Sequence, residues 1–137
     1  MKYIQKATMA FFLTLLFVKP IIGIAATQAN PVFDEANITL TTSMYATFNA
    51  ETSYTCSKIW VSSCYLQRMS STGTVLSSTL VPAPTKSSSN TSSFDAERSY
   101  SSYVTSGQRY RIKATFKATY NSATYSTTAY SAIKTAN

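Results

Sequence analysis

The sequence predicts an all-β protein, a β-sandwich of six or seven antiparallel strands. The strongest indication is the segment from Arg109 to Tyr120, in which apolar and basic residues alternate with a period of two. This period sorts side chains onto the two faces of a strand, and no helix would sort them in this way. Similar short segments recur along the chain between turn residues. The chain is also rich in Thr and Tyr, which favour strands.

Residues 1–25 have the three-part pattern of a secretory signal peptide. Lys2 and Lys6 make the start positive, an apolar run covers residues 7–18, and Gly23-Ile24-Ala25 offers small residues to a signal peptidase. The alternative is a retained membrane helix, but a Lys-Pro pair interrupts that span and a charge there is costly. We therefore expect the signal peptide to be removed and the protein to be secreted to the extracellular space.

Removal of the signal peptide leaves a polar lead-in, residues 26–37, and one domain, residues 38–137. This part carries nine basic residues against five acidic ones, a net charge of +4. About 110 residues suffice for a single hydrophobic core. The mildly basic balance favours an anionic polymer as partner, and is too weak to predict a specific nucleic-acid domain. We expect no stable membrane insertion after signal removal.

The predicted strands follow one another without a helical window between them. From Ile38 to Ala50 the alternation fits one bent strand or two short ones. The further strands are expected at residues 58–68, 74–80, 99–104, 109–120 and 123–133. Residues 51–55 and the Ser-rich segment 85–93 are predicted to be loops. Gly73 and Gly107 are predicted turn positions, because glycine adopts a positive φ at little cost.

The segment from Val104 to Tyr110 resembles the turn that leads into the sixth strand of fibronectin type III and immunoglobulin-like domains. There an apolar residue, a Gly turn and a Tyr precede alternating apolar positions. The resemblance implies an immunoglobulin/fibronectin type III-like sandwich. It also implies that Tyr110 is a corner tyrosine, with a buried ring and a hydroxyl bonded to nearby backbone.

The chain also resembles small exported β-sandwich proteins of Gram-positive bacteria, a family of unknown function. The shared motifs are Lys58-Ile59, Leu66-Gln67, the turn from Gly107 to Arg111, and Tyr130-Ser131. These motifs are structural and transfer no catalytic residue. The chain departs from immunoglobulin domains in two respects. The usual core Trp of the second strand is absent, with Phe48 as a candidate substitute, and the inter-sheet disulfide has no counterpart.

The two cysteines, Cys56 and Cys64, allow two incompatible arrangements. An oxidising compartment favours a disulfide. Residues eight apart on a straight strand are about 26 Å apart, however, whereas a disulfide needs Cα atoms within about 7 Å. Pairing would require the chain to fold back between Ser57 and Ser63. The alternative keeps residues 58–68 as a core strand and leaves free thiols or an intermolecular bridge. The sequence leaves both arrangements open, and the spacing excludes a Cys-x-x-Cys redox site.

Few residues in the chain are of the types that usually serve in catalysis. The chain has no histidine, which removes Ser-His-Asp and Cys-His chemistry and most zinc sites. We interpret its five acidic residues as solubilising loop residues: Asp34, Glu35, Glu51, Asp95 and Glu97. No Gly-rich phosphate loop or metal-ligand cluster is present in the sequence. We therefore expect a protein that is not an enzyme and has neither cofactor nor metal.

The outward positions of the segment 109–120 form the best candidate binding surface. We call Arg109, Arg111, Lys113 and Lys117 the basic ridge. In an immunoglobulin-like sandwich the third and sixth strands are neighbours, which would place the ridge beside Trp60 and Tyr65. Cations beside exposed aromatic rings suit an anionic glycan or cell-wall polymer. The alternative is a solvated sheet face whose like charges oppose strand pairing with other chains.

These observations leave three classes of function. The first is a secreted binding module for an anionic envelope or extracellular polymer, which the ridge favours. The second is a structural or matrix protein that self-associates through its sheet edges. The third is a membrane-active toxin, and the lack of an amphipathic helix argues against it.

Overall fold

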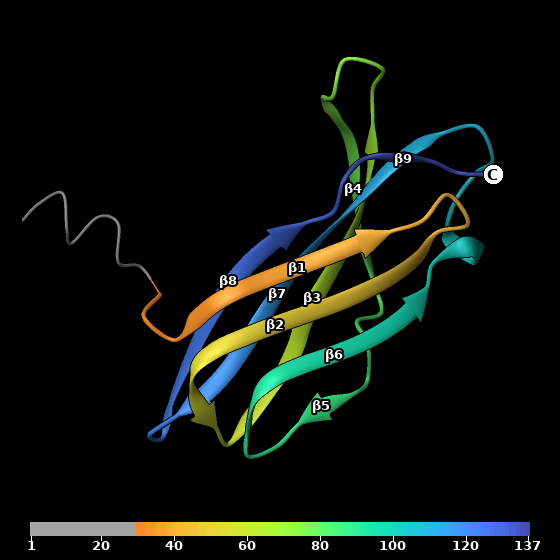
Figure 1. Cartoon of the computed structure of the whole chain (residues 1–137). Coiled ribbons are helices and arrows are strands. Elements are labelled where there is room, and N and C mark those ends of the chain that lie inside the picture. Colours follow the sequence, from red (N-terminus) through yellow and green to blue (C-terminus); the bar gives the residue numbers. More distant parts are fainter. Residues whose placement is uncertain (1–29) are drawn as a thin grey trace, which may run out of the picture. The chain divides into compact units, whose positions relative to one another are not determined.

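The computed structural model describes residues 30–137, and the compact unit within them is Val32–Asn137. This unit is all-β and consists of two antiparallel sheets that pack face to face as in a β-sandwich (Figure 1). The predicted signal peptide and residues 26–29 of the predicted lead-in lie outside the described residues. Within residues 30–137 there is no helix long and apolar enough to span a bilayer.

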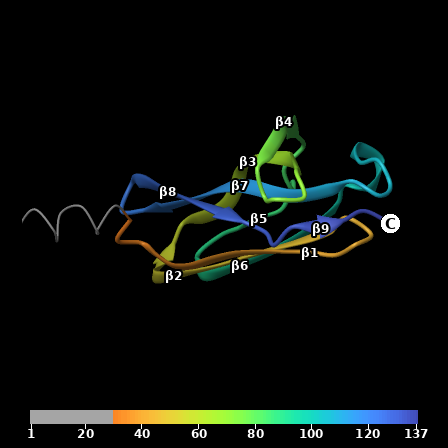
Figure 2. The ribbon, with the colours of Figure 1, turned by 90° about the horizontal axis from the view of Figure 1, so that it is seen from above.

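The two layers differ in size (Figure 2). The three-stranded sheet has the order β1 (Phe33–Leu40), β2 (Tyr45–Cys56), β6 (Thr91–Ser99). The main path of the six-stranded sheet is β4 (Val75–Val81), β3 (Lys58–Met69), β7 (Arg109–Tyr120), β8 (Ala123–Tyr130). Two short strands complete it: β5 (Ser87–Ser88) pairs with β3, and β9 (Lys134–Thr135) pairs with β7. A 3-10 turn, Ser101–Tyr103, precedes β7.

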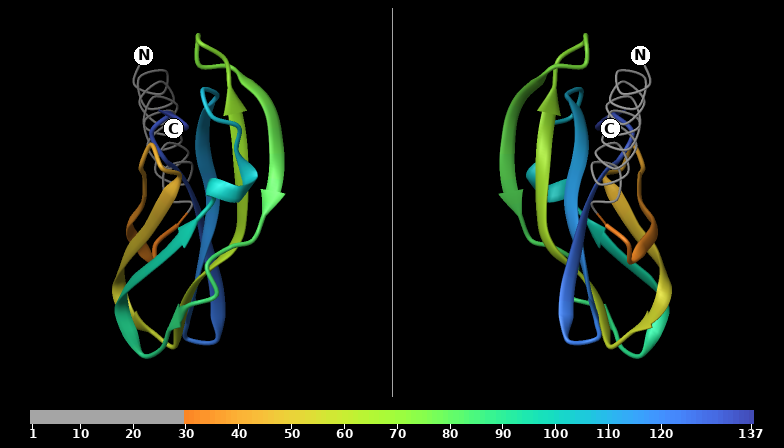
Figure 3. Two further views of the ribbon diagram at one scale, coloured as in Figure 1. Left: turned by 90° about the vertical axis from the view of Figure 1, so that its right-hand side faces the viewer. Right: turned by 90° about the vertical axis from the view of Figure 1, so that its left-hand side faces the viewer.

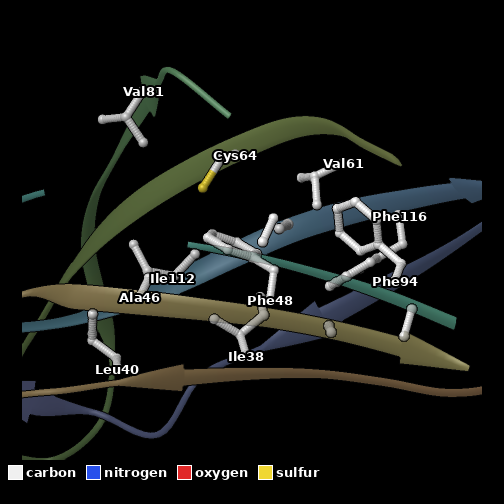
Figure 4. Close-up of a cluster of buried hydrophobic side chains, with 14 of the residues drawn as sticks. Ile38, Leu40, Ala46, Phe48, Val61, Cys64, Val81, Phe94, Ile112 and Phe116 are labelled. Atoms are coloured by element: carbon white, nitrogen blue, oxygen red, sulfur yellow. The ribbon is translucent and has the colours of Figure 1, made fainter. Parts of the chain in front are cut away.

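The core lies between the sheets and is centred on three aromatic rings (Figure 4). Phe116 of β7 packs against Phe48 of β2 and Phe94 of β6, with both centroid distances 6.3 Å. The alternation predicted for β7 is confirmed, since its even-numbered residues from Tyr110 to Ala118 are buried. Because inward residues interlock in this way, the outward residues of β7 must face solvent.

The alternation that begins at Ile38 forms two strands, joined by a turn at residues 41–44. β1 begins at Phe33, five residues before the predicted start of the domain, because Val32 is buried and its carbonyl accepts a hydrogen bond from the Ser53 N–H. The same contact holds residues 51–55 in β2. The loop predicted there is therefore wrong.

The region before β7 also differs from the prediction. The strand expected at residues 99–104 is wrong, because β6 covers Thr91–Ser99 and residues 101–103 form the 3-10 turn. Only Phe94 and Ala96 of β6 are buried, and polar residues surround them. Two inward residues are too short a pattern to identify a strand from sequence, whereas pairing with β2 fixes its position.

Candidate functional site

The basic ridge lies on the outer face of the six-stranded sheet. β7 occupies the centre of that sheet, with β3 on one side and β8 on the other. Each ridge residue is half-buried, because the neighbouring strands flank its aliphatic stem. β7 thus holds the four basic side chains along one line, and the two adjacent strands supply the other groups of the site.

A β-bulge in β3 brings Trp60 and Tyr65 onto the same outer face. These residues are five apart, so a regular strand would place them on opposite faces. The register of β3 against β7 shifts between Val61 and Ser63, which reverses the side-chain parity beyond that point. As a result Trp60 lies opposite Lys117, and Tyr65 lies opposite Lys113.

The middle of the ridge is a preorganised group of cations and rings. The guanidinium carbon of Arg111 lies 4.6 Å from the ring centroid of Tyr130, and the Lys113 Nζ lies 6.0 Å from it. The Arg111 Nε also donates a hydrogen bond of 2.7 Å to the Gln67 Oε1. Tyr130 on β8 was not among the predicted site residues. Its register opposite Lys113 depends on the β7–β8 hairpin.

A second group lies at the end of the ridge that contains Lys117. The Lys58 Nζ lies 4.4 Å from the ring centroid of Trp60, and Trp60 pairs with Lys117 across the sheet. Lys58 was also missed from the sequence, although it stands two residues before Trp60 and therefore shares its face. Two cations thus border this half-buried indole.

Arg109, at the other end, has a structural contact. Its Nη1 donates to the carbonyl oxygens of Ser70 and Ser71, at 3.3 and 2.8 Å. These residues form the turn between β3 and β4. Part of the donor capacity of Arg109 is therefore used within the fold, and the ridge residues best placed to meet a ligand are Arg111, Lys113 and Lys117.

Charge is divided between the two sheets. All five acidic residues of the chain lie on strands of the three-stranded sheet: Asp34 and Glu35 on β1, Glu51 on β2, and Asp95 and Glu97 on β6. Of the nine basic residues from 30 to 137, seven lie on strands of the six-stranded sheet: Lys58, Arg68, Arg109, Arg111, Lys113, Lys117 and Lys134. The interpretation of the acidic residues as loop residues is therefore wrong.

Three of the acidic residues, Glu35, Glu51 and Asp95, line one surface pocket of the three-stranded sheet. Glu35 and Glu51 are directly opposite one another on β1 and β2, on a solvent-exposed face. Asp95 forms an exposed ion pair with Lys86, with 3.2 Å between Oδ2 and Nζ. Within the described part of the chain, no group of three or more Cys, Asp or Glu residues could hold a metal ion.

Cys56 and Cys64 are two separate free thiols, so of the two arrangements that the sequence left open the structure has the one without a disulfide between them. Cys56 ends β2, whereas Cys64 lies within β3, which continues through the segment that would have had to fold back. Both side chains are buried. The Cys64 Sγ lies 3.3 Å from the Tyr100 hydroxyl, which donates to the Pro82 carbonyl at 2.8 Å. Burial raises the pKa of the Cys64 thiol to about 11, so it is not a reactive thiolate at neutral pH.

No family model and no curated protein matches this chain. On the outer face of the six-stranded sheet, three ridge cations lie among Trp60, Tyr65 and Tyr130.

Proposed function

We propose that this protein is secreted and binds an anionic extracellular polymer through the outer face of its six-stranded sheet, without catalysing a reaction. The observation that carries the proposal is the arrangement of Arg111 and Lys113 beside the exposed ring of Tyr130, on a sheet whose strands contain no acidic residue. Export is supported by the three-part pattern of residues 1–25.

The proposed fold type is fibronectin type III. Its support is the strand order, in which the first, second and fifth main strands (β1, β2, β6) face the other four (β4, β3, β7, β8). The buried Tyr110 at the start of β7 adds to this support, since its hydroxyl bonds to the backbone of Thr105. In this fold type the sheet that carries the ridge presents a broad outer face to solvent.

The chemistry of the face suits a polymer that carries both negative groups and rings. Guanidinium and ammonium groups bind phosphate or carboxylate, while an aromatic ring covers the apolar face of a sugar. Lys113 and Lys117 are four residues apart, which is about 13 Å along a strand. A chain with repeated anionic groups can therefore contact the middle of the ridge and its Lys117 end together.

The division of charge between the two sheets indicates which face an anionic polymer would bind. An anionic chain is attracted to the six-stranded sheet and repelled from the acidic outer face of the other sheet. A merely solvated face would explain the charged residues on β7. It offers no reason for the bulge in β3 that turns both Trp60 and Tyr65 toward them.

The test is retention of the protein on immobilised anionic wall polymers and glycans, with neutral glycans as the reference. We expect retention that falls as salt is added, because screening shortens the range of the attraction. The double variant Arg111→Ser/Lys113→Ser should lose retention.

The matched control removes two positive charges that do not belong to the ridge: Lys86 lies outside the strands, and Lys134 is opposite the inward residue Tyr110. Lys86→Ser/Lys134→Ser changes the net charge by the same amount but leaves the outer-face cluster intact. It should retain most of the binding. Equal losses in the two double variants would mean that only net charge matters, and would refute the assignment of the site.

A further inference from the structure

β4 is an open edge of the six-stranded sheet, visible at the margin of the structure in Figure 3. It pairs with β3 on one side, and residues 75–80 are all exposed. The strand, Val-Leu-Ser-Ser-Thr-Leu-Val, has no charge, proline or glycine. Natural proteins block exposed edges with such residues, because unpaired backbone groups are a template for another strand.

The other edge strands are less suited to pairing with a strand of another chain. β1 and β6 carry acidic residues, and β8 lies beside β1 of the facing sheet. β4 therefore combines an open backbone edge with exposed apolar side chains. Leu80 is 66% exposed and Leu76 is 53% exposed.

The order of side chains in β4 is nearly the same in both directions. Around Ser78, Ser77 matches Thr79, Leu76 matches Leu80, and Val75 matches Val81. An antiparallel pair of two such strands, related by a two-fold axis at Ser78, would place each residue opposite one of its own kind. This self-complementarity is what a two-fold symmetric interface requires.

We propose that two copies of this protein pair through their β4 strands, antiparallel and centred on Ser78, to form a continuous sheet. Backbone hydrogen bonds hold the pair, and Leu80 of each copy lies beside Leu76 of the other. The register of β4 against β3 shifts only at its beginning, between the partners of Arg68 and Met69. From Ser77 to Val81 the strand is regular, and the exposed Leu76 lies within the shift.

The dimer would place two polymer-binding ridges in one assembly. Antiparallel pairing keeps the outer faces on the same side, so the two basic ridges share one surface. Five strand spacings separate the two β7 strands, or about 24 Å. A polymer that contacts both ridges is held by two sites at once, which increases its retention. This consequence rests on the proposed polymer binding, whereas the dimer itself does not.

The first test is oxidative cross-linking of the protein expressed from its full sequence, with the single substitution Ser78→Cys. Ser78 is exposed, and in the dimer it faces Ser78 of the other copy within reach of a disulfide. The native cysteines are buried and do not compete. Thr128→Cys, exposed on β8 at the opposite edge, is the matched control. Cross-linked dimer with Ser78→Cys and none with Thr128→Cys supports the proposal, and equal cross-linking in both, or none, overturns it.

The second test measures solution mass without any polymer. We expect a dimer that persists at high salt, and a monomer for Leu76→Lys/Leu80→Lys, because like charges across paired strands repel. Thr124→Lys/Thr128→Lys adds the same charge to β8 and should remain dimeric. A monomeric wild-type protein, or a dimer that survives the Leu substitutions, refutes β4 pairing.

The same measurement separates this proposal from polymer binding. Arg111→Ser/Lys113→Ser should remain dimeric even though it no longer binds the polymer. A monomer that still binds polymer through the ridge would overturn the dimer alone, and a dimer without retention would overturn the polymer site alone.

Discussion

The hydroxyl of Tyr110 accepts a hydrogen bond from the backbone N–H of Thr105, with 2.9 Å between oxygen and nitrogen. The ring is only 6% exposed, and the bond spans the turn at Gly107, whose φ is +85°. One tyrosine thus connects the turn to the first residues of β7, the strand that carries the basic ridge. This contact is the structural role that the sequence resemblance implied for Tyr110.

Replacing Tyr110 by Phe should destabilise the domain by about 1–2 kcal/mol, because the ring stays buried while the Thr105 N–H loses its partner. Urea unfolding followed by circular dichroism measures the loss. Tyr130→Phe removes a hydroxyl from a half-exposed ring and should change the stability by less than about 0.5 kcal/mol. Similar losses for both variants would contradict the role of the Tyr110 hydroxyl.

The β7–β8 turn should be improved by Ser122→Gly. Asn121 and Ser122 both have positive φ, 47° and 62°, as in a type I′ hairpin turn. Asn tolerates this region and Gly adopts it freely, but Ser is strained there. We expect a gain of up to about 1 kcal/mol in the free energy of unfolding. Ser106→Gly, at a turn residue without a positive φ, should give no gain, and a gain there would count against this explanation.

Stability should fall as the solution becomes alkaline. The Cys64 thiol ionises near pH 9.0 in the ordinary case and near pH 11 when buried in the fold. Between pH 9 and pH 11 the unfolded chain gives up the thiol proton, whereas the folded chain keeps it. The free energy of unfolding is therefore highest below pH 9 and falls as the pH rises to 11. Two pKa units correspond to a loss of about 2–3 kcal/mol. Burial also raises the pKa of Tyr100, which acts in the same direction.

The variant that isolates the thiol is Cys64→Ala. It should lower the stability at neutral pH but show a shallower decline between pH 9 and pH 11, since the Cys64 thiol no longer contributes to that decline. An unchanged slope would contradict the role of Cys64. Thiol titration supplies the complementary check: two thiols should react after unfolding and none in the folded protein, because both cysteines are free and buried.

The accuracy of the sequence-based predictions follows the length of each alternating pattern. β7 was predicted correctly because six inward residues from Tyr110 to Tyr120 alternate with polar ones over its whole length. β6 was missed because only Phe94 and Ala96 face the core. The sequence predicts a loop at the end of β2 because polar residues predominate there, although pairing with neighbouring strands keeps them extended.

The candidate site was predicted only in part for a similar reason. Alternation along β7 identified the four ridge residues, since it is a local property of one segment. Lys58 and Tyr130 belong to other strands, and they join the site through cross-strand register. The β7–β8 hairpin sets the register of Tyr130, and the bulge near Ser62 brings Tyr65 to the same face as Trp60. Alternation within one segment determines neither of these.

Local order along the chain is thus sufficient to determine that this protein is built of strands, and which side of β7 is apolar and which is basic. Contacts between distant segments decided the rest: that Cys56 and Cys64 stay apart, that acidic and basic residues occupy different sheets, and that Trp60 faces the ridge. The physical reason is the range of the interactions. Side-chain alternation acts between adjacent residues, whereas strand pairing and core packing join residues tens of positions apart.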